Sequence, residues 1–144
     1  MPFPAFCYNA ALIMAPTVDL FVYGTLMDEQ RIYALAGQSF PRRKAELFGF
    51  TRLFSVQGYP FITPCPGAKT SGFVLSAVHQ EALRVFDQYE DEGVLYYRRP
   101  VMVVVEGQLL SCETYIGNAT ALTASPAAHD GVVNESQPLK RSIS

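Results

Sequence analysis

The sequence predicts an α+β domain, in which an antiparallel or mixed sheet curls into a small barrel with short helices on its flank. Most of its patterned segments are typical of strands, and only two have helical spacing. The two helical segments follow the first strand and precede a final hairpin. The chain has 144 residues, of which 49% are hydrophobic and 17% charged, so it is long and apolar enough for one domain with a buried core.

The first two elements are expected at residues 20–23 and 28–36. Residues 20–23 (LFVY) are strand formers and predict a buried strand. The polar residues that follow predict a helix, because Asp28 can cap its start and Glu29 suits its positive end. Gly37 then provides a stop signal.

A long strand and a loop are expected next. Residues 42–56 alternate imperfectly between apolar and polar, which predicts one strand bent at Gly49. Residues 57–72 are rich in Pro and Gly and predict a loop, with a short extended piece at residues 61–62.

The remaining elements are a strand at residues 73–78, a helix within 79–93 that stops at Gly93, and a hairpin at 96–117 that turns at Glu106-Gly107. The second helix has these apolar residues at helical spacing: Ala82, Leu83, Val85, Phe86 and Tyr89.

The chain therefore divides into three segments. Residues 1–17 are expected to be a disordered extension, since they lack a positively charged start and Pro2 and Pro4 interrupt them. Residues 18–117 form the folded domain. Residues 118–144 are small and polar, with no stripe wide enough to pack, and are expected to be a mobile tail.

Charge and hydropathy exclude several classes of partner. A formal net charge of −2 and a pI near 5.6 give no electrostatic basis for binding nucleic acid or an acidic membrane. No apolar run reaches the roughly 18 residues that a membrane span needs.

The cysteines predict neither a disulfide framework nor a metal site. Cys7, Cys65 and Cys112 are odd in number, far apart and without a C-x-x-C pair. A cysteine nucleophile would need a histidine base, and His79 and His129 stand at a helix start and in the tail. We expect a reducing, cytoplasmic setting, with no metal.

The first candidate site is the segment Tyr23-Gly24-Thr25-Leu26, where a strand ends in a glycine turn just before a helix. Such a turn leaves backbone N–H groups around Thr25 to Met27 without strand or helix partners. Groups of this kind bind carboxylates or stabilise an oxyanion. The alternative is an ordinary strand end at which glycine turns the chain.

The second candidate site is the acidic end of the second helix, which holds Asp87, Glu90, Asp91 and Glu92. The helix dipole, neighbouring acids and apolar cover each raise the pKa of a carboxylate, and a raised pKa suits proton transfer near neutral pH. The alternative is a solvated turn whose charges pair with Arg98 and Arg99.

Together, a backbone anion site and a poised carboxylate are two parts of an acyl-transfer site. The sequence offers no Ser-His pair and no metal cluster, so the nucleophile would have to come from the substrate.

The motifs "FVYGTL" and "FDQYEDEGVLYYRRPVMVVV" are similar to those of the gamma-glutamylcyclotransferase superfamily, in particular its gamma-glutamylamine cyclotransferase / AIG2-like branch. The resemblance covers roughly residues 18–117 and implies a small mixed β-barrel with flanking helices. His79 stands where members usually have Ser or Thr before the second helix, which predicts a cap weaker by about 1 kcal/mol.

The resemblance also implies a function. Residues 23–26 (Tyr23, Gly24, Thr25, Leu26) would bind the glutamyl part of a small gamma-glutamyl amine or peptide, and Glu90 would be the proton acceptor that lets the substrate amine cyclise to 5-oxoproline. No cofactor is implied, and no role is assigned to Asp91 or Glu92. The alternative is a non-catalytic AIG2-like protein that binds a small anion or takes part in stress-response interactions.

Overall fold

Five strands form the closed barrel of the computed structural model, which describes residues 16–124. Its elements are β1 (Thr17–Val22), a 3-10 turn η1 (Thr25–Met27), α2 (Glu29–Ala36), β2 (Arg42–Phe54), β3 (Pro60–His79), α3 (Gln80–Glu90), β4 (Tyr96–Val105) and β5 (Gln108–Gly117). The strand order is β1-β3-β2-β4-β5. All strand pairs are antiparallel except β1 with β5, so the predicted mixed barrel is confirmed.

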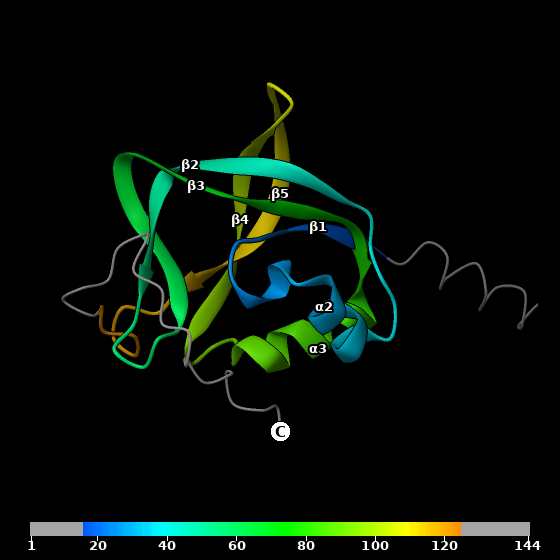
Figure 1. Cartoon of the computed structure of the whole chain (residues 1–144), viewed down its shortest axis with the longest axis horizontal. Helices are drawn as coiled ribbons and strands as arrows, with labels where there is room; N and C mark the ends of the chain where they lie inside the picture. Colours follow the sequence, from blue (N-terminus) through cyan, green and yellow to red (C-terminus); the bar gives the residue numbers. More distant parts are fainter. Residues whose placement is uncertain (1–15, 125–144) are drawn as a thin grey trace, which may run out of the picture.

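The two helices lie next to each other on one side of the barrel, below β1 in Figure 1, and the tip of the β4–β5 hairpin projects on the opposite side. Alternate residues of β1 point to opposite faces of the sheet. Leu20 and Val22 pack with the helices, whereas Phe21 and Tyr23 pack into a second apolar cluster. β1 therefore connects the two halves of the core.

Local signals set the first helix and the last turn. Asp28 caps α2 by accepting a hydrogen bond from the N–H of Gln30 (3.0 Å), and Gly37 ends the helix with a φ of 74°. Glu106 and Gly107 have φ angles of 51° and 80°, which suit the two-residue turn between β4 and β5. These predictions are confirmed, as is the bend at Gly49, where the β2–β3 register shifts.

The prediction of a loop at residues 57–72 is wrong over most of its length, because β3 begins at Pro60 and pairs with β2 along both strands. β1 pairs with β3 only from Phe73 onward. The first half of β3 is thus an edge, and an edge strand tolerates prolines, which cannot donate to a ladder.

The second helix ends earlier than predicted. α3 stops at Glu90, because Asp91 takes the left-handed conformation (φ 61°) and its N–H bonds back to the carbonyl oxygens of Asp87 and Gln88. Gly93 shapes the turn beyond the helix. At the other end, the Nδ1 atom of His79 accepts from the N–H of Ala82 (3.2 Å), so the ring itself provides the cap.

The folded part of the chain extends beyond the expected boundary at residue 117. Leu122, which we assigned to the tail, is 2% exposed and packs in the core, and Thr123 accepts a backbone hydrogen bond from Val56 (2.8 Å). Residues 1–15 and 125–144 lie outside the described residues, so the extension and the rest of the tail stay predictions.

Candidate functional site

Glu90 lies on the apolar face of α3. It follows Phe86 by four residues and Leu83 by seven, and residues at these spacings share one side of a helix. Only 6% of its surface is exposed, although its side chain is ionisable. The helical spacing therefore directs the Glu90 side chain toward the interior of the protein.

The other three acids of the predicted cluster have different surroundings. Asp87 binds Arg98 through two contacts of 2.9 and 3.1 Å and accepts from the hydroxyl of Tyr115 (2.5 Å). Asp91 forms the helix end, and Glu92 is exposed and accepts from the N–H of Arg98 (3.3 Å). The alternative of a solvated, charge-paired turn is thus met in two parts: Asp87 pairs with the guanidinium of Arg98, and Glu92 is solvated.

The loop after β1 presents backbone donors. The N–H of Met27 bonds to the carbonyl oxygen of Gly24 (2.9 Å) in the short turn η1. Among the described residues, no hydrogen bond is donated by the N–H groups of Gly24, Thr25 or Leu26. These three groups are one position earlier than the set around Thr25 to Met27 that the sequence suggested.

The structure brings Glu90 and this loop together in one cavity. Its lining residues are Phe21, Val22, Tyr23, Gly24, Thr25, Leu26, Pro60, Glu90 and Tyr115. The cavity has a volume of about 10 Å³, which is about the room for one water molecule. A glutamyl group would need its walls to move apart.

Tyrosines surround the acid, and sequence reasoning gave a site role to only one of them. The Tyr23 hydroxyl donates to the carbonyl oxygen of Tyr115 (2.5 Å), and the Tyr96 hydroxyl donates to that of Pro60 (2.6 Å). The Tyr89 hydroxyl donates to Thr25 Oγ1 (3.0 Å), and the Tyr115 hydroxyl donates to the carboxylate of Asp87 (2.5 Å). Burial is the main cause that raises the pKa of all four, and the negative charge of Glu90 raises each further. They therefore stay neutral hydrogen-bond donors at neutral pH.

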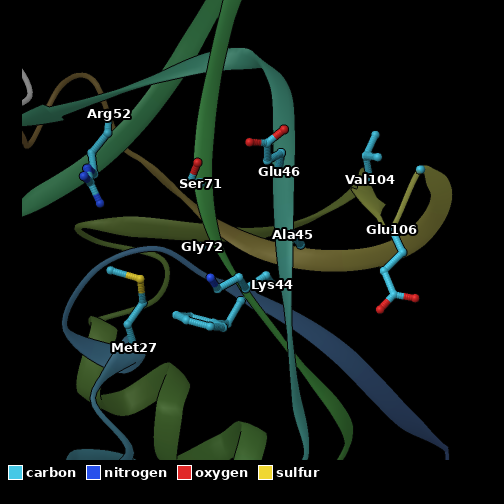
Figure 2. Close-up of a pocket in the computed structure, with 11 residues that line it drawn as sticks. Met27, Lys44, Ala45, Glu46, Arg52, Ser71, Gly72, Val104 and Glu106 are labelled. Atoms are coloured by element: carbon cyan, nitrogen blue, oxygen red, sulfur yellow. The ribbon is translucent and has the colours of Figure 1, made fainter.

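A larger groove of about 630 Å³ lies beside the same loop, and Figure 2 shows its lining. Met27 and Arg52 line it near the loop, and Glu46 and Glu106 lie farther along it. Glu90 is not among its lining residues. We take the smaller cavity as the candidate site, because it joins the acid to the backbone donors.

Arg52 is a site neighbour that the sequence analysis did not single out. Its Nη1 atom donates to the carbonyl oxygen of Tyr23 (2.8 Å), directly before Gly24. Its side chain reaches from β2 to the residue after β1 although β3 lies between these two strands in the sheet, and no local pattern in the sequence reveals that contact.

The remaining candidates for chemistry lie elsewhere. Burial, together with Asp19 and Glu113, raises the pKa of the Cys112 thiol to about 12, so it is not a nucleophile at neutral pH. Within residues 16–124 there is no cluster of His, Cys, Asp or Glu that could hold a metal ion. The same residues contain no helix long and apolar enough to cross a membrane.

Comparison with known proteins gives a match over most of the chain. Residues 20–134 match the family model described as "Gamma-glutamyl cyclotransferase, AIG2-like". "AIG2-like protein C" of Arabidopsis thaliana is 36% identical over 102 residues, which are 68% of this chain and 58% of that protein. The chain thus matches little more than half of that relative's length.

Solved structures share the fold. A protein of Arabidopsis thaliana known from a solution structure has a TM-score of 0.65 and 24% identity, covering 78% of this chain and 79% of its own. A structure named "Gamma-glutamyl cyclotransferase" has a TM-score of 0.63 and 18% identity, covering 83% and 95%. At these identities the similarity concerns the fold alone.

Proposed function

The chain belongs to the AIG2-like gamma-glutamyl cyclotransferase family, and we propose that it releases 5-oxoproline from a small gamma-glutamyl amine or gamma-glutamyl peptide. One observation carries this proposal: the buried carboxylate of Glu90 lines the same cavity as the N–H donors of residues 24–26. This neighbourhood supports the assignment of Glu90 as the base and of the loop as the anion site.

In the proposed reaction, the substrate supplies the nucleophile. Its α-amine attacks its own γ-carbonyl carbon, a new C–N bond closes the five-membered lactam, and the bond to the leaving amine breaks. Because the attack is intramolecular, holding the folded substrate provides much of the rate advantage. Glu90 takes the proton that the α-ammonium group must lose and passes it to the leaving amine.

The loop supplies the complementary part. The N–H groups of residues 24–26 would bind the α-carboxylate or the oxyanion that forms on the γ-carbonyl oxygen. The step needs no metal or cofactor, because nucleophile, base and donors all come from substrate and chain. The cysteine pattern supports a reducing compartment such as the cytoplasm for this activity.

The proposal requires the cavity to open, since it holds about one water molecule as it stands. The hydroxyl of Tyr89 on α3 donates to Thr25 Oγ1 on the loop (3.0 Å), so this bond holds the loop against the helix that carries Glu90, and both elements contribute walls of the cavity. We propose that the substrate separates these two walls when it binds.

The direct test is a substrate panel. Purified protein is incubated with gamma-glutamyl alkylamines and gamma-glutamyl dipeptides, and 5-oxoproline is followed by mass spectrometry. Time-dependent release from at least one compound, proportional to enzyme concentration, is expected. No release from any compound in the panel would contradict the proposal.

The small cavity favours a second candidate, a non-catalytic protein that binds a small anion. It predicts that wild type and Glu90→Gln bind glutamate-like ligands alike in calorimetric titrations and that neither forms product. If wild type forms product and Glu90→Gln does not, this candidate is excluded.

Replacing Gly24 with alanine is expected to raise the KM for gamma-glutamyl substrates at least about tenfold. A Cβ atom at Gly24 would lie 2.9 Å from Cγ of Pro60, and both residues line the cavity. The Pro60 carbonyl oxygen is held by the hydroxyl of Tyr96, so the ring cannot easily retreat. Steady-state kinetics check this, and an unchanged KM in a stably folded variant would place the substrate elsewhere.

A further inference from the structure

Two opposite charges act on Tyr23, the first residue of the candidate glutamyl-binding loop (residues 23–26). After burial, the negative charge of Glu90 raises the pKa of the Tyr23 hydroxyl, and the positive charge of Arg52 lowers it. Arg52 lies on β2 and binds the Tyr23 carbonyl oxygen at 2.8 Å. The loop therefore has the proposed base and a guanidinium as close neighbours.

The bond from Arg52 has a geometric consequence for Gly24. The carbonyl oxygen of Tyr23 and the N–H of Gly24 belong to one planar peptide unit, which is trans, as are the other peptide bonds of residues 16–124. In a trans unit these two groups point in opposite directions. When Arg52 holds the oxygen toward β2, the Gly24 N–H points away from β2.

A second arginine of β2 holds the other end of the loop. The Nη2 atom of Arg42 donates to the carbonyl oxygen of Met27 (2.7 Å). Arg42 is itself fixed by an ion pair with Glu29 (3.3 Å) and by its position 4.0 Å above the ring of Phe73. β2 thus fixes the segment from Tyr23 to Met27 at both of its ends.

Figure 2 shows Arg52 extending from β2 on the side of the groove where Met27 also lies. The candidate cavity includes Tyr23 and the three residues after it, but neither arginine. Arg52 thus reaches the loop from the groove, whereas Glu90 reaches it from the cavity.

We propose that Arg52 is a positioning residue for the glutamyl-binding loop: it fixes the Tyr23–Gly24 peptide so that the Gly24 N–H faces the substrate cavity. This inference rests on the proposed function, and it adds a residue outside the cavity to the binding apparatus. A guanidinium suits the task, because its planar, always charged fork holds a carbonyl oxygen in one direction better than a flexible amine does.

The first experiment follows the loop itself. Two-dimensional ¹H–¹⁵N NMR spectra of wild type, Arg52→Gln and Arg43→Gln are compared at the Gly24 amide. We expect the Gly24 signal to shift in Arg52→Gln and to stay in place in Arg43→Gln, which removes an exposed charge from the same strand. An unshifted Gly24 amide in Arg52→Gln would overturn the inference without any reference to substrate.

The second experiment follows the substrate. For Arg52→Gln we expect KM to rise about tenfold and kcat to change less than about threefold. The reason is that the Gly24 N–H, as a donor to the substrate carboxylate, would stabilise the bound substrate and the transition state equally. Arg52→Lys keeps a positive donor and should recover part of this loss, whereas Arg43→Gln should match wild type. If the activity of Arg52→Gln fell only in step with its melting temperature, and Arg52→Lys did not recover it, Arg52 would have a merely structural role.

The two proposals fail in different ways. If wild type neither binds 5-oxoproline in calorimetry nor forms it, the proposed function fails, and the NMR comparison alone decides whether Arg52 positions the loop. If wild type is active and Arg52→Gln has the same KM, only the inference about Arg52 is wrong.

Discussion

Replacing Glu90 with glutamine is expected to slow 5-oxoproline release by about 10²–10⁴-fold, the usual contribution of a general base. Glutamine has the same shape but cannot take up the proton of the substrate amine. KM should change little, because the N–H donors of residues 24–26 remain. Initial rates measured by mass spectrometry of 5-oxoproline give the comparison.

The matched control is Glu81→Gln, which makes the same chemical change in the first turn of α3, where the side chain is exposed. It should keep the wild-type rate. If Glu90→Gln turns substrate over as fast as wild type, Glu90 is not the base.

Replacing Gly72 with alanine is expected to cause the largest loss of stability, about 3 kcal/mol in the free energy of unfolding. A Cβ atom at Gly72 would lie 2.2 Å from the carbonyl oxygen of Val22 and 3.0 Å from the ring of Phe21. The clash is with backbone, so β1 and β3 would have to move apart. The melting temperature should fall by roughly 10 °C.

Ser71→Ala is the control for this change, because it introduces the same side chain at the exposed neighbouring position of β3. It should alter stability by about 0.5 kcal/mol or less. Equal melting temperatures for Gly72→Ala and Ser71→Ala would show that the two strands do not approach as closely as described.

Elements with local signals could be predicted from the sequence. Asp28 marks the start of α2 through its side-chain hydrogen bond, and Gly37 marks its end through its left-handed backbone angle. Glu106-Gly107 forms the tight turn of a β-hairpin. In each case the residues that set the structure lie next to the element that they define.

The strand β3 could not be predicted in the same way. Pro60, Pro64 and Pro66 indicate a loop to any local reading, yet Pro60 and Pro64 pair with Phe54 and Phe50 of β2. Their strand is allowed because β1 pairs only with the later half of β3, a fact of topology that no short segment contains.

The candidate site was partly readable. Helical spacing from Leu83 and Phe86 selects Glu90 among its neighbouring acids as the one that faces inward, independently of the family resemblance. Nothing in the sequence marks Asp91 as the residue that ends α3, because a left-handed residue other than glycine at a helix end is uncommon. The cavity's small volume depends on how the loop, Pro60 and Tyr115 meet, which only the folded chain shows.

In the proposed site, the acid of α3 and the N–H groups after β1 hold one glutamyl group between them. A crystal structure of the protein with 5-oxoproline tests this arrangement most directly. We expect the ligand in the cavity between Glu90 and residues 24–26, with its carboxylate or carbonyl oxygen accepting from those N–H groups and its ring nitrogen about 3 Å from the Glu90 carboxylate. A ligand found instead in the groove lined by Arg52 and Glu106, with the cavity beside Glu90 still closed, would contradict it.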